Sequence, residues 1–440
     1  MSQQVTQKGL DAFWMPYTSN RAFKADPRII TGAEGAYYID DRGRKIFDGL
    51  SGLWTCGIGH SHKQISDAVG QQLLDLDYAP AFQFGHPKAF ALAERLADLA
   101  PGDLNRVFFT NSGSEATDTA TKIARAYWRQ KGEPTKTRII GRAKGYHGAS
   151  WGGISWGGIG GNRKLWGQAI ESDHLKHTLQ PGHEFTKGQS ETGAELADEL
   201  LEMIALHDAS NIAAVIVEPF SGSAGVIIPP KGYLKRLANI CKQHNILLIF
   251  DEVITGLGRA GGYFGADVFG VTPDMICMAK QITNGTVPMG AVLAQDEIYQ
   301  TFMNAGGAEQ NVELPHGYTY SGHPVACAAA LATLDILEQD KIIPRVAELS
   351  PYFEEAVHGL KGCQHILDIR NFGLAAGISV AHRNGDATIR PTEIALKLWE
   401  MGFYVRFGGD TIQLGLPFIS EKAEIDRLMT AMEEAFNKTA

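Results

Sequence analysis

Three charged residues beside apolar runs have side chains that could take part in chemistry. Lys280 follows the run at residues 275–278, where burial would lower the pKa of its amine and make it a nucleophile suited to Schiff-base chemistry. Asp251 follows the run at residues 246–250, and a carboxylate at a strand end could hold a metal or pair with a cationic ring nitrogen. Arg406 lies among aromatic and aliphatic neighbours, where its guanidinium could bind a substrate carboxylate. Singly, each also fits a plain role as a solvent-reaching lysine, a turn acid or a salt-bridge partner.

A segment rich in small polar residues, at 110–116, follows a strand-like run and opens a helical stretch. The free amides and positive end of a helix N-terminus favour an anion, and nearby hydroxyls add donors. An ordinary helix cap, with Ser114 as the capping residue, explains the same pattern. The segment is therefore a candidate phosphate site with a structural alternative.

Other patterns point to different chemistry. Residues 256–261 match the dinucleotide fingerprint, but five residues separate them from the preceding strand and no helical period follows, so we expect no dinucleotide there. Cys56, His60 and His62 are metal-ligand types on a glycine-rich turn without a fourth ligand, and no metal is predicted. Trp54, close to two glycines, is the tryptophan expected in a pocket.

Combined, these signals describe one ligand. A phosphate cradle, a carboxylate at a strand end and a nucleophilic lysine match a phosphorylated cofactor with a cationic ring nitrogen and an aldehyde. Pyridoxal 5'-phosphate (PLP) is that cofactor. An arginine for a carboxylate adds a substrate that carries one.

Composition narrows the function classes. The chain has 440 residues, a formal net charge of −9 and 44% hydrophobic residues, which is typical of a globular protein and argues against nucleic-acid or anionic-membrane partners. The longest apolar run, near residues 325–332, is too short to span a bilayer, and the first 20 residues lack the apolar stretch of a signal peptide. Five cysteines without C-x-x-C spacing favour a reducing, cytoplasmic location.

The sequence around these residues predicts an α/β fold. Continuous apolar runs predict strands buried on both faces, as in a parallel sheet. A helical stretch at residues 232–244 lies between two of these runs and predicts a βαβ unit. The predicted strands are residues 107–109, 212–217, 246–250, 275–278 and 291–294.

The two chain ends differ from this centre. Short extended pieces occur in the first 60 residues, and helices alternate with strand-like pieces in the last 100. We predict a large central domain and a smaller domain built mainly from the C-terminal part. The boundaries are an N-terminal segment at 1–55, a large domain at 56–325 and a small domain at 326–440.

At this point the sequence resembles the class III (ω-) aminotransferases of fold-type I PLP enzymes, nearly end to end. Motifs that carry the resemblance lie at residues 111–116, 145–148, 251–259, 279–280 and 319–324. Residues 52–54, 279–285 and 316–320 are most similar to the ω-amino acid–pyruvate subgroup. The resemblance implies a mostly parallel seven-stranded sheet flanked by helices, and a smaller α+β domain from the chain ends.

It also implies a cofactor site. Lys280 would form the Schiff base, Asp251 would hold the ring nitrogen protonated, and Glu218 would lie on the ring hydroxyl side. The implied cofactor-binding set is Ser112, Gly113, Ser114, Tyr146, His147, Glu218, Asp251, Val253, Lys280 and Thr319.

Within that set, Gly113 and Ser114 would bind the phosphate, and Thr319 would reach it from the neighbouring subunit. Tyr146 and Val253 would cover the two ring faces. The resemblance therefore implies a homodimer with shared active sites, and members of the subgroup are often tetramers. The implied substrate-binding residues are Tyr17, Leu53, Trp54, Phe82, Arg406 and Gln413.

The expected reaction is ping-pong transfer of an amino group from an ω-amino acid, such as β-alanine, or a primary amine to pyruvate. L-Alanine and a semialdehyde, aldehyde or ketone are the products. Taurine–pyruvate or polyamine–pyruvate transfer stays open, as does decarboxylase, racemase or aminomutase chemistry on the same fold. A nicotinamide oxidoreductase and a non-catalytic scaffold are the readings from other classes.

Overall fold

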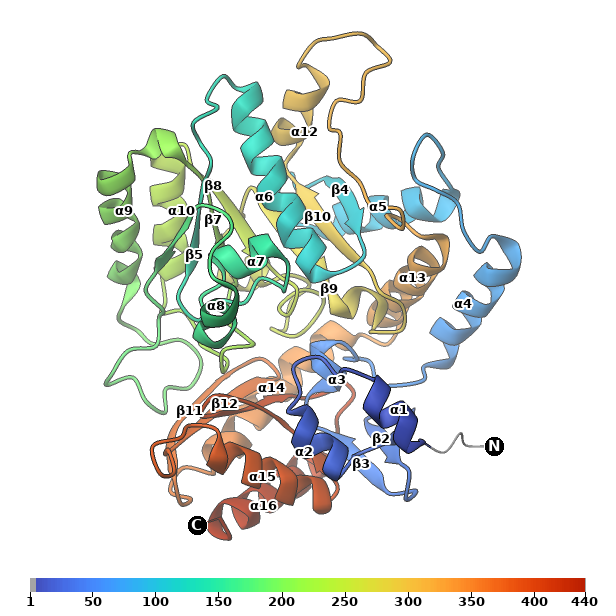
Figure 1. The fold of residues 1–440 in the computed structure, drawn as a ribbon, viewed down its shortest axis with the longest axis vertical. Helices are drawn as coiled ribbons and strands as arrows, with labels where there is room; N and C mark the ends of the chain where they lie inside the picture. Colours follow the sequence, from blue (N-terminus) through green and yellow to red (C-terminus); the bar gives the residue numbers. More distant parts are fainter. Residues whose placement is uncertain (1–4, 440) are drawn as a thin grey trace.

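A seven-stranded sheet forms the centre of the computed structural model, which describes residues 5–439 (Figure 1). β10 pairs antiparallel with both β4 and β9, while the other pairs in this sheet are parallel. Its residues form a continuous apolar run like those of the parallel strands, so burial on both faces does not by itself reveal strand direction. The strands lie in the order β4 (Arg106–Thr110), β10 (Gly290–Ala294), β9 (Met275–Ala279), β8 (Leu247–Asp251), β7 (Ile212–Val217), β5 (Arg138–Arg142) and β6 (Ser172–Leu175).

The reversal of β10 follows from its connection. Only residues 280–289 join β9 to β10, and they contain the 3-10 helix η3 (Lys280–Thr283). A parallel connection needs a crossover of a dozen or more residues. The short link therefore returns the chain antiparallel and keeps Lys280 at the end of β9.

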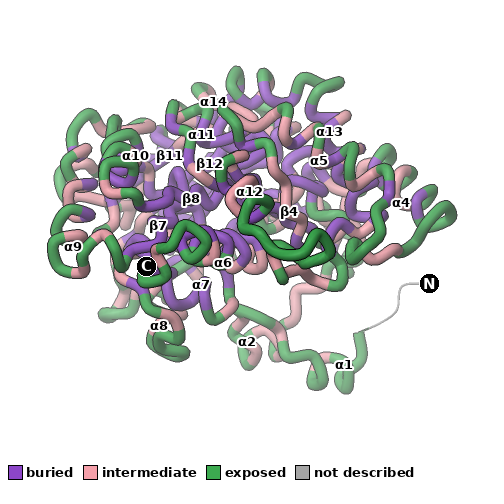
Figure 2. The backbone as a smooth tube through the Cα atoms, turned by 90° about the horizontal axis from the view of Figure 1, so that it is seen from above, coloured by how far each residue is buried: buried purple, intermediate pink, exposed green. Residues whose placement is uncertain are grey.

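The predicted βαβ unit is confirmed. Helix α10 (Tyr233–Gln243) connects β7 to β8 and buries Leu234, Leu237 and Ile240 on one face, as the helical period requires. Every residue of β7 to β10 is buried, and Figure 2 shows β7 and β8 in the buried interior of the molecule.

The chain ends fold together below this sheet (Figure 1). The N-terminal strands β1 (Ile30–Glu34), β2 (Tyr37–Asp40) and β3 (Lys45–Asp48) form an antiparallel ribbon. β13 (Phe403–Tyr404) pairs in parallel with β3, so one sheet combines strands from the N-terminal and the C-terminal parts of the chain. A third sheet has the order β11 (Ile366–Phe372), β12 (Ala375–Val380), β15 (Thr411–Gly415) and β14 (Arg406–Gly408).

Helices cover the sheets. Those around the large sheet include α4 (Lys63–Asp75), α5 (Pro87–Leu99), α6 (Gly113–Gln130), α7 (Trp151–Trp156), α8 (Gly160–Trp166), α9 (Glu199–His207), α11 (Gly265–Phe269) and α12 (Asp296–Met303). The others are α1 (Gln7–Ala12), α2 (Asn20–Ala25), α3 (Ser51–Trp54), α13 (Pro324–Gln339), α14 (Ile342–His358), α15 (Ile389–Glu400) and α16 (Lys422–Asn437). Across residues 5–439, none combines the length and apolar character that crossing a membrane requires. The domain boundaries at 55 and 325 stay predictions.

Candidate active site

A cavity of about 140 Å³ lies where the carboxyl ends of the parallel strands meet, which is where open α/β sheets bind ligands. Loops after β4, β5, β7, β8 and β9 each supply part of its wall. The lining residues are Gly113, Ser114, Tyr146, His147, Gly148, Glu218, Asp251, Val253, Ile254 and Lys280.

Lys280 begins η3 directly after β9 and has a φ of 55°, a left-handed backbone that costs energy outside glycine. Burial lowers the pKa of its amine to about 8, although Asp251 and Glu218 oppose the shift, while Arg406 and Arg259 add to it. A large fraction of the amine is therefore neutral near pH 8, as a nucleophile or proton acceptor must be.

Asp251 ends β8 and both of its oxygens are bound by the protein. The Val253 amide donates to Oδ1 at 3.1 Å, and His147 Nδ1 donates to Oδ2 at 2.8 Å. This pair is buried. His147 Nε2 has no hydrogen-bond partner among the described residues. The resemblance places His147 in the cofactor-binding set but assigns it no role. Its hydrogen bond to Asp251 makes it the residue that orients this carboxylate.

Glu218 follows β7 and is the second buried acid. Burial raises its pKa to about 7, with His147 lowering it and Asp251 raising it. Its Oε2 accepts a hydrogen bond from the Tyr146 amide at 3.2 Å. A buried acid whose pKa is raised to near neutrality inside a cavity is a common feature of catalytic sites.

Helix α6 points its N-terminus into the cavity. Ser112, not Ser114, is the capping residue: its hydroxyl accepts from the Glu115 amide at 3.2 Å. Ser114 Oγ instead accepts from the Ala149 amide at 3.1 Å. The structural alternative for Ser114 is thus wrong, and the cavity receives the first-turn amides of Gly113 and Ser114, which have no acceptor inside the helix.

Several residues predicted from the resemblance do not line the cavity of the single chain. Trp54 is 2% exposed and packs in an apolar cluster with Phe220 and Ile254, whereas its neighbour Leu53 is 45% exposed. Phe82, Thr319 and Tyr17 are exposed, and Ser112 caps α6 from outside the lining.

Tyr17 nevertheless acts on the cavity. Burial raises the pKa of the Tyr146 phenol, and the charge and hydrogen bond of Tyr17 raise it further, while Arg406 lowers it. Arg406 begins β14 opposite Gln413 of β15. Gln413 is buried and donates to the Ser223 carbonyl at 2.9 Å. Arg406 is thus near both Tyr146 and Lys280, from the C-terminal part of the chain.

Two lining residues were missed by sequence reasoning. Gly148 lies in the 145–148 motif and has a φ of 102°, and a Cβ there would lie 2.5 Å from Ser114 Oγ. A glycine inside a functional motif is a signal for such close approach. Ile254 had no signal of its own, because only its place after β8 brings it to the wall.

The remaining motifs fold differently from their literal reading. Residues 256–261 form turns rather than a helix start, and Arg259 is buried there. His60 donates to Asp48 at 2.8 Å. Within residues 5–439, no group of three or more His, Cys, Asp and Glu side chains could hold a metal ion.

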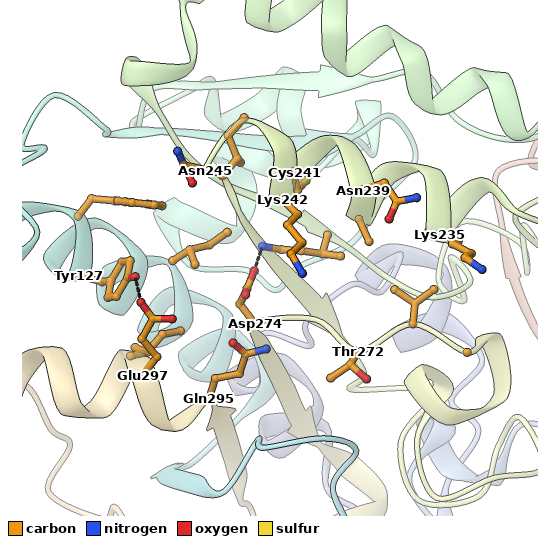
Figure 3. Close-up of a pocket in the computed structure, with 18 residues that line it drawn as sticks. Tyr127, Lys235, Asn239, Cys241, Lys242, Asn245, Thr272, Asp274, Gln295 and Glu297 are labelled. Atoms are coloured by element: carbon orange, nitrogen blue, oxygen red, sulfur yellow. Dashed lines mark hydrogen bonds between the residues drawn. The ribbon is translucent and has the colours of Figure 1, made fainter.

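A larger cavity, of about 580 Å³, lies at the opposite end of the strands, lined by 18 residues (Figure 3). Its two acids already have hydrogen-bond partners: Asp274 accepts from the Leu248 amide at 2.6 Å, and Glu297 accepts from the Tyr127 hydroxyl at 3.1 Å. Lys235 and Lys242 are exposed on α10. It therefore resembles a solvated groove more than a reaction site.

The smaller cavity fits PLP. Its lining offers the Lys280 amine with its lowered pKa, the Asp251 carboxylate and the amides at the N-terminus of α6. These groups match the aldehyde, the ring nitrogen and the phosphate of PLP, respectively. Glycine keeps the space open, since a Cβ on Gly113 would lie 2.9 Å from Val253. Lys280, Asp251, Gly113 and Ser114 would hold the group.

Comparison with known proteins agrees with this site. The family model for class III aminotransferases matches residues 18–436. The chain is 62% identical to the β-alanine–pyruvate aminotransferase of Pseudomonas aeruginosa and 60% identical to the ω-amino acid–pyruvate aminotransferase of Pseudomonas putida, covering 99% of this chain and 97% of each relative. A PLP-bound amine transaminase structure from an uncultivated Pseudomonas species superposes with a TM-score of 0.90 at 36% identity, covering 98% of this chain and 99% of that one. The chain belongs to the class III aminotransferases and is a PLP-dependent enzyme.

Proposed function

We propose that this enzyme transfers the amino group of an ω-amino acid, such as β-alanine, to pyruvate. The observation that carries the proposal is that Lys280, whose amine has a lowered pKa, lines the same cavity as the hydrogen-bonded Asp251–His147 pair. Identities of 62% and 60% to enzymes named for these substrates support the substrate class over taurine or polyamines.

When bound, PLP supplies an aldehyde that condenses with amines and a ring that accepts the electron pair released at the donor carbon. Lys280 Nζ would take the proton from the donor carbon and later return it, as general base and then acid. Asp251, oriented by His147, would hold a proton on the ring nitrogen. Glu218 lies beside this carboxylate and is a second proton-holding group near neutral pH.

Arg406 gives the pocket its preference for carboxylates. A guanidinium binds a carboxylate with two parallel hydrogen bonds, and Arg406 is near enough to Lys280 for its charge to add to the lowered pKa that burial causes there. β-Alanine and pyruvate place their carboxylates at different distances from the reacting atom. A single mobile arginine serves both.

A second copy of the chain completes the site in this proposal. Thr319 is exposed and outside the cavity lining, so its proposed contact with the phosphate comes from a neighbouring subunit. Exposed aromatic side chains, which a subunit interface would cover, support this proposal. They include Phe13, Trp14, Tyr17, Phe82, Phe84, Phe90 and Tyr320.

Product analysis tests the reaction. With β-alanine and pyruvate, we expect L-alanine and malonate semialdehyde in equal amounts, and no turnover when pyruvate is omitted. Carbon dioxide or a rearranged amine without pyruvate would instead identify decarboxylase or aminomutase chemistry. Taurine or putrescine outperforming β-alanine would overturn the substrate class.

Mixed subunits test the shared site. Lys280→Ala chains lack the amine, and Thr319→Ala chains lack the proposed phosphate hydroxyl. If sites are shared, a mixed dimer contains one intact site, so co-expression restores roughly a quarter of all sites. If Thr319 acts within its own chain, or not at all on the phosphate, mixing restores nothing beyond the average of the parents.

A further inference from the structure

The turn at residues 49–57 has a strained backbone beside the cavity. Ser51, Gly52 and Trp54 have φ values of 50°, 68° and 66°, and only glycine adopts this region without cost. Its tip, Leu53, is 45% exposed, while Trp54 is buried beneath it. Such a backbone persists only where surrounding contacts hold it.

One set of contacts comes from Asp48, at the end of β3. This carboxylate is fully buried; its Oδ1 accepts from the Leu50 amide at 3.1 Å, and its Oδ2 accepts from the Gly52 amide. His60 Nε2 donates to the same Oδ2 at 2.8 Å. Burial lowers the pKa of His60, but Asp48 and Cys56 raise it overall to about 9, so the His60 imidazole is protonated near neutral pH.

The second set comes from Arg259, the cation of the false dinucleotide motif. It is 1% exposed, and Nη2 donates to Ser51 Oγ at 3.1 Å. Nη1 donates to the carbonyls of Leu374 and Leu416 in the C-terminal part. Its guanidinium carbon lies 5.6 Å from the centre of the Trp54 ring. The buried Arg259 guanidinium thus links its own segment after β8 to the turn and to the C-terminal part of the chain.

The turn in turn links the two ends of the substrate site. The Gly49 amide donates to the Tyr404 carbonyl at 2.9 Å, two residues before Arg406. On the other side, the Gly57 amide donates to Gln281 Oε1 at 2.8 Å, next to Lys280. The segment therefore spans from the strand leading to Arg406 to the helix that begins at Lys280.

We propose that Arg259, acting through Ser51 with Asp48 and His60, is a positioning residue for substrate selection: it fixes the span between Lys280 and the carboxylate-binding Arg406. The inference rests on the proposed function for the identity of the carboxylate donor. Loosening the turn lets this span vary, which weakens substrates held at both ends and spares amines held only at one.

Ser51→Ala is the sharpest test, because it removes the Arg259 contact and the 2.6 Å bond from Ser51 to the Gly415 carbonyl while leaving Arg259 in place. Ser172→Ala is the matched control: its buried hydroxyl also donates to one carbonyl at 2.6 Å, but from edge strand β6. We expect Ser51→Ala to lower kcat/KM for β-alanine about tenfold, through a higher KM. The kcat/KM for 1-propylamine, which lacks the carboxylate, should change by less than about threefold.

Equal losses of kcat/KM for both donors would overturn the proposal. A Ser172→Ala control with the same difference between the two donors would overturn it as well. A second pair separates charge from fork geometry: Arg259→Met should show a larger split than Arg259→Lys, which keeps the cation but loses the planar fork. Equal behaviour of these two would also contradict it.

Amide hydrogen exchange tests the positioning role without any substrate, so it applies even if the proposed substrate class is wrong. Amide hydrogen exchange at Gly52 and Trp54 should accelerate in Ser51→Ala and stay unchanged in Ser172→Ala. Unchanged exchange in both would reject the positioning role, whereas accelerated exchange with no use of β-alanine would reject only the proposed function.

Discussion

The two ends of the central sheet differ in a way that size does not predict. The cavity at the carboxyl ends has about 140 Å³ and brings together Lys280, Glu218 and the Asp251–His147 pair, while the one at the opposite end has about 580 Å³ and acids that already accept hydrogen bonds. Parallel strands bring all their carboxyl ends to one edge, so loops from distant sequence converge there. The candidate site therefore follows the convergence of functional groups from several strands rather than the volume of the cavity.

The largest expected effect is at Lys280. Lys280→Ala removes both the nucleophile and the proton carrier, so kcat should fall on the order of 10⁴-fold. PLP should still bind through the helix amides and Asp251. Stopped-flow transamination with β-alanine measures the loss; turnover near the wild-type value would contradict the assignment.

Asp251→Asn is expected to cost about 10²–10³-fold in kcat, because the neutral amide no longer stabilises a positive ring nitrogen. His147→Phe leaves the carboxylate but removes the 2.8 Å bond that orients it, and should cost less. Steady-state kinetics with retained PLP, measured by absorbance, separates the two. A His147 variant worse than the Asp251 variant would reverse the proposed order of roles.

Arg406→Ala should lower kcat/KM for β-alanine by about 10- to 100-fold, the usual loss for a hydrogen bond to a charged group. Simple amines should lose much less, since they carry no carboxylate. Parallel assays with β-alanine and 1-propylamine measure the difference. Equal loss for both donors would remove Arg406 from the substrate site.

Acid should slow cofactor loading of the apoenzyme. Only the neutral amine attacks an aldehyde, and burial lowers the pKa of Lys280 to about 8. The loading rate should therefore rise about tenfold per pH unit below pH 8 and level off above it. Absorbance after mixing apoenzyme with PLP gives the profile. A rise that continues to pH 10 would mean that the lysine is not desolvated.

The smallest effect is expected in the opposite cavity. Asp274→Asn removes an acid whose pKa burial raises to about 6, yet no reacting group lies there. We expect kcat/KM within about twofold of the wild type, in line with substitutions far from a site. A loss above tenfold would show that the larger cavity takes part in the function.

Sequence patterns predict what depends on neighbours in the chain. Lys280 and Asp251 could be singled out because each follows an apolar run, and the end of a buried strand is readable locally. The direction of β10 was not readable, since its pattern matches a parallel strand. The length of its connection to β9 decides it.

Long-range contacts account for what the sequence could not predict. Trp54 was expected in a pocket, but its ring packs against Gly415, where a Cβ would lie 2.4 Å away. Arg259 could only be recognised as a decoy, because its partners Leu374 and Leu416 lie more than 100 residues away along the chain. Contacts of this kind follow from tertiary packing and leave no local periodicity.

The visible absorption spectrum of the purified enzyme, recorded during addition of β-alanine and then pyruvate, tests both the cofactor site and the proposed amino transfer. We predict a yellow band from the Lys280-bound cofactor that bleaches with β-alanine and returns with pyruvate. A band that β-alanine leaves unchanged would contradict the proposed donor. No band even after added PLP would contradict the cofactor site itself.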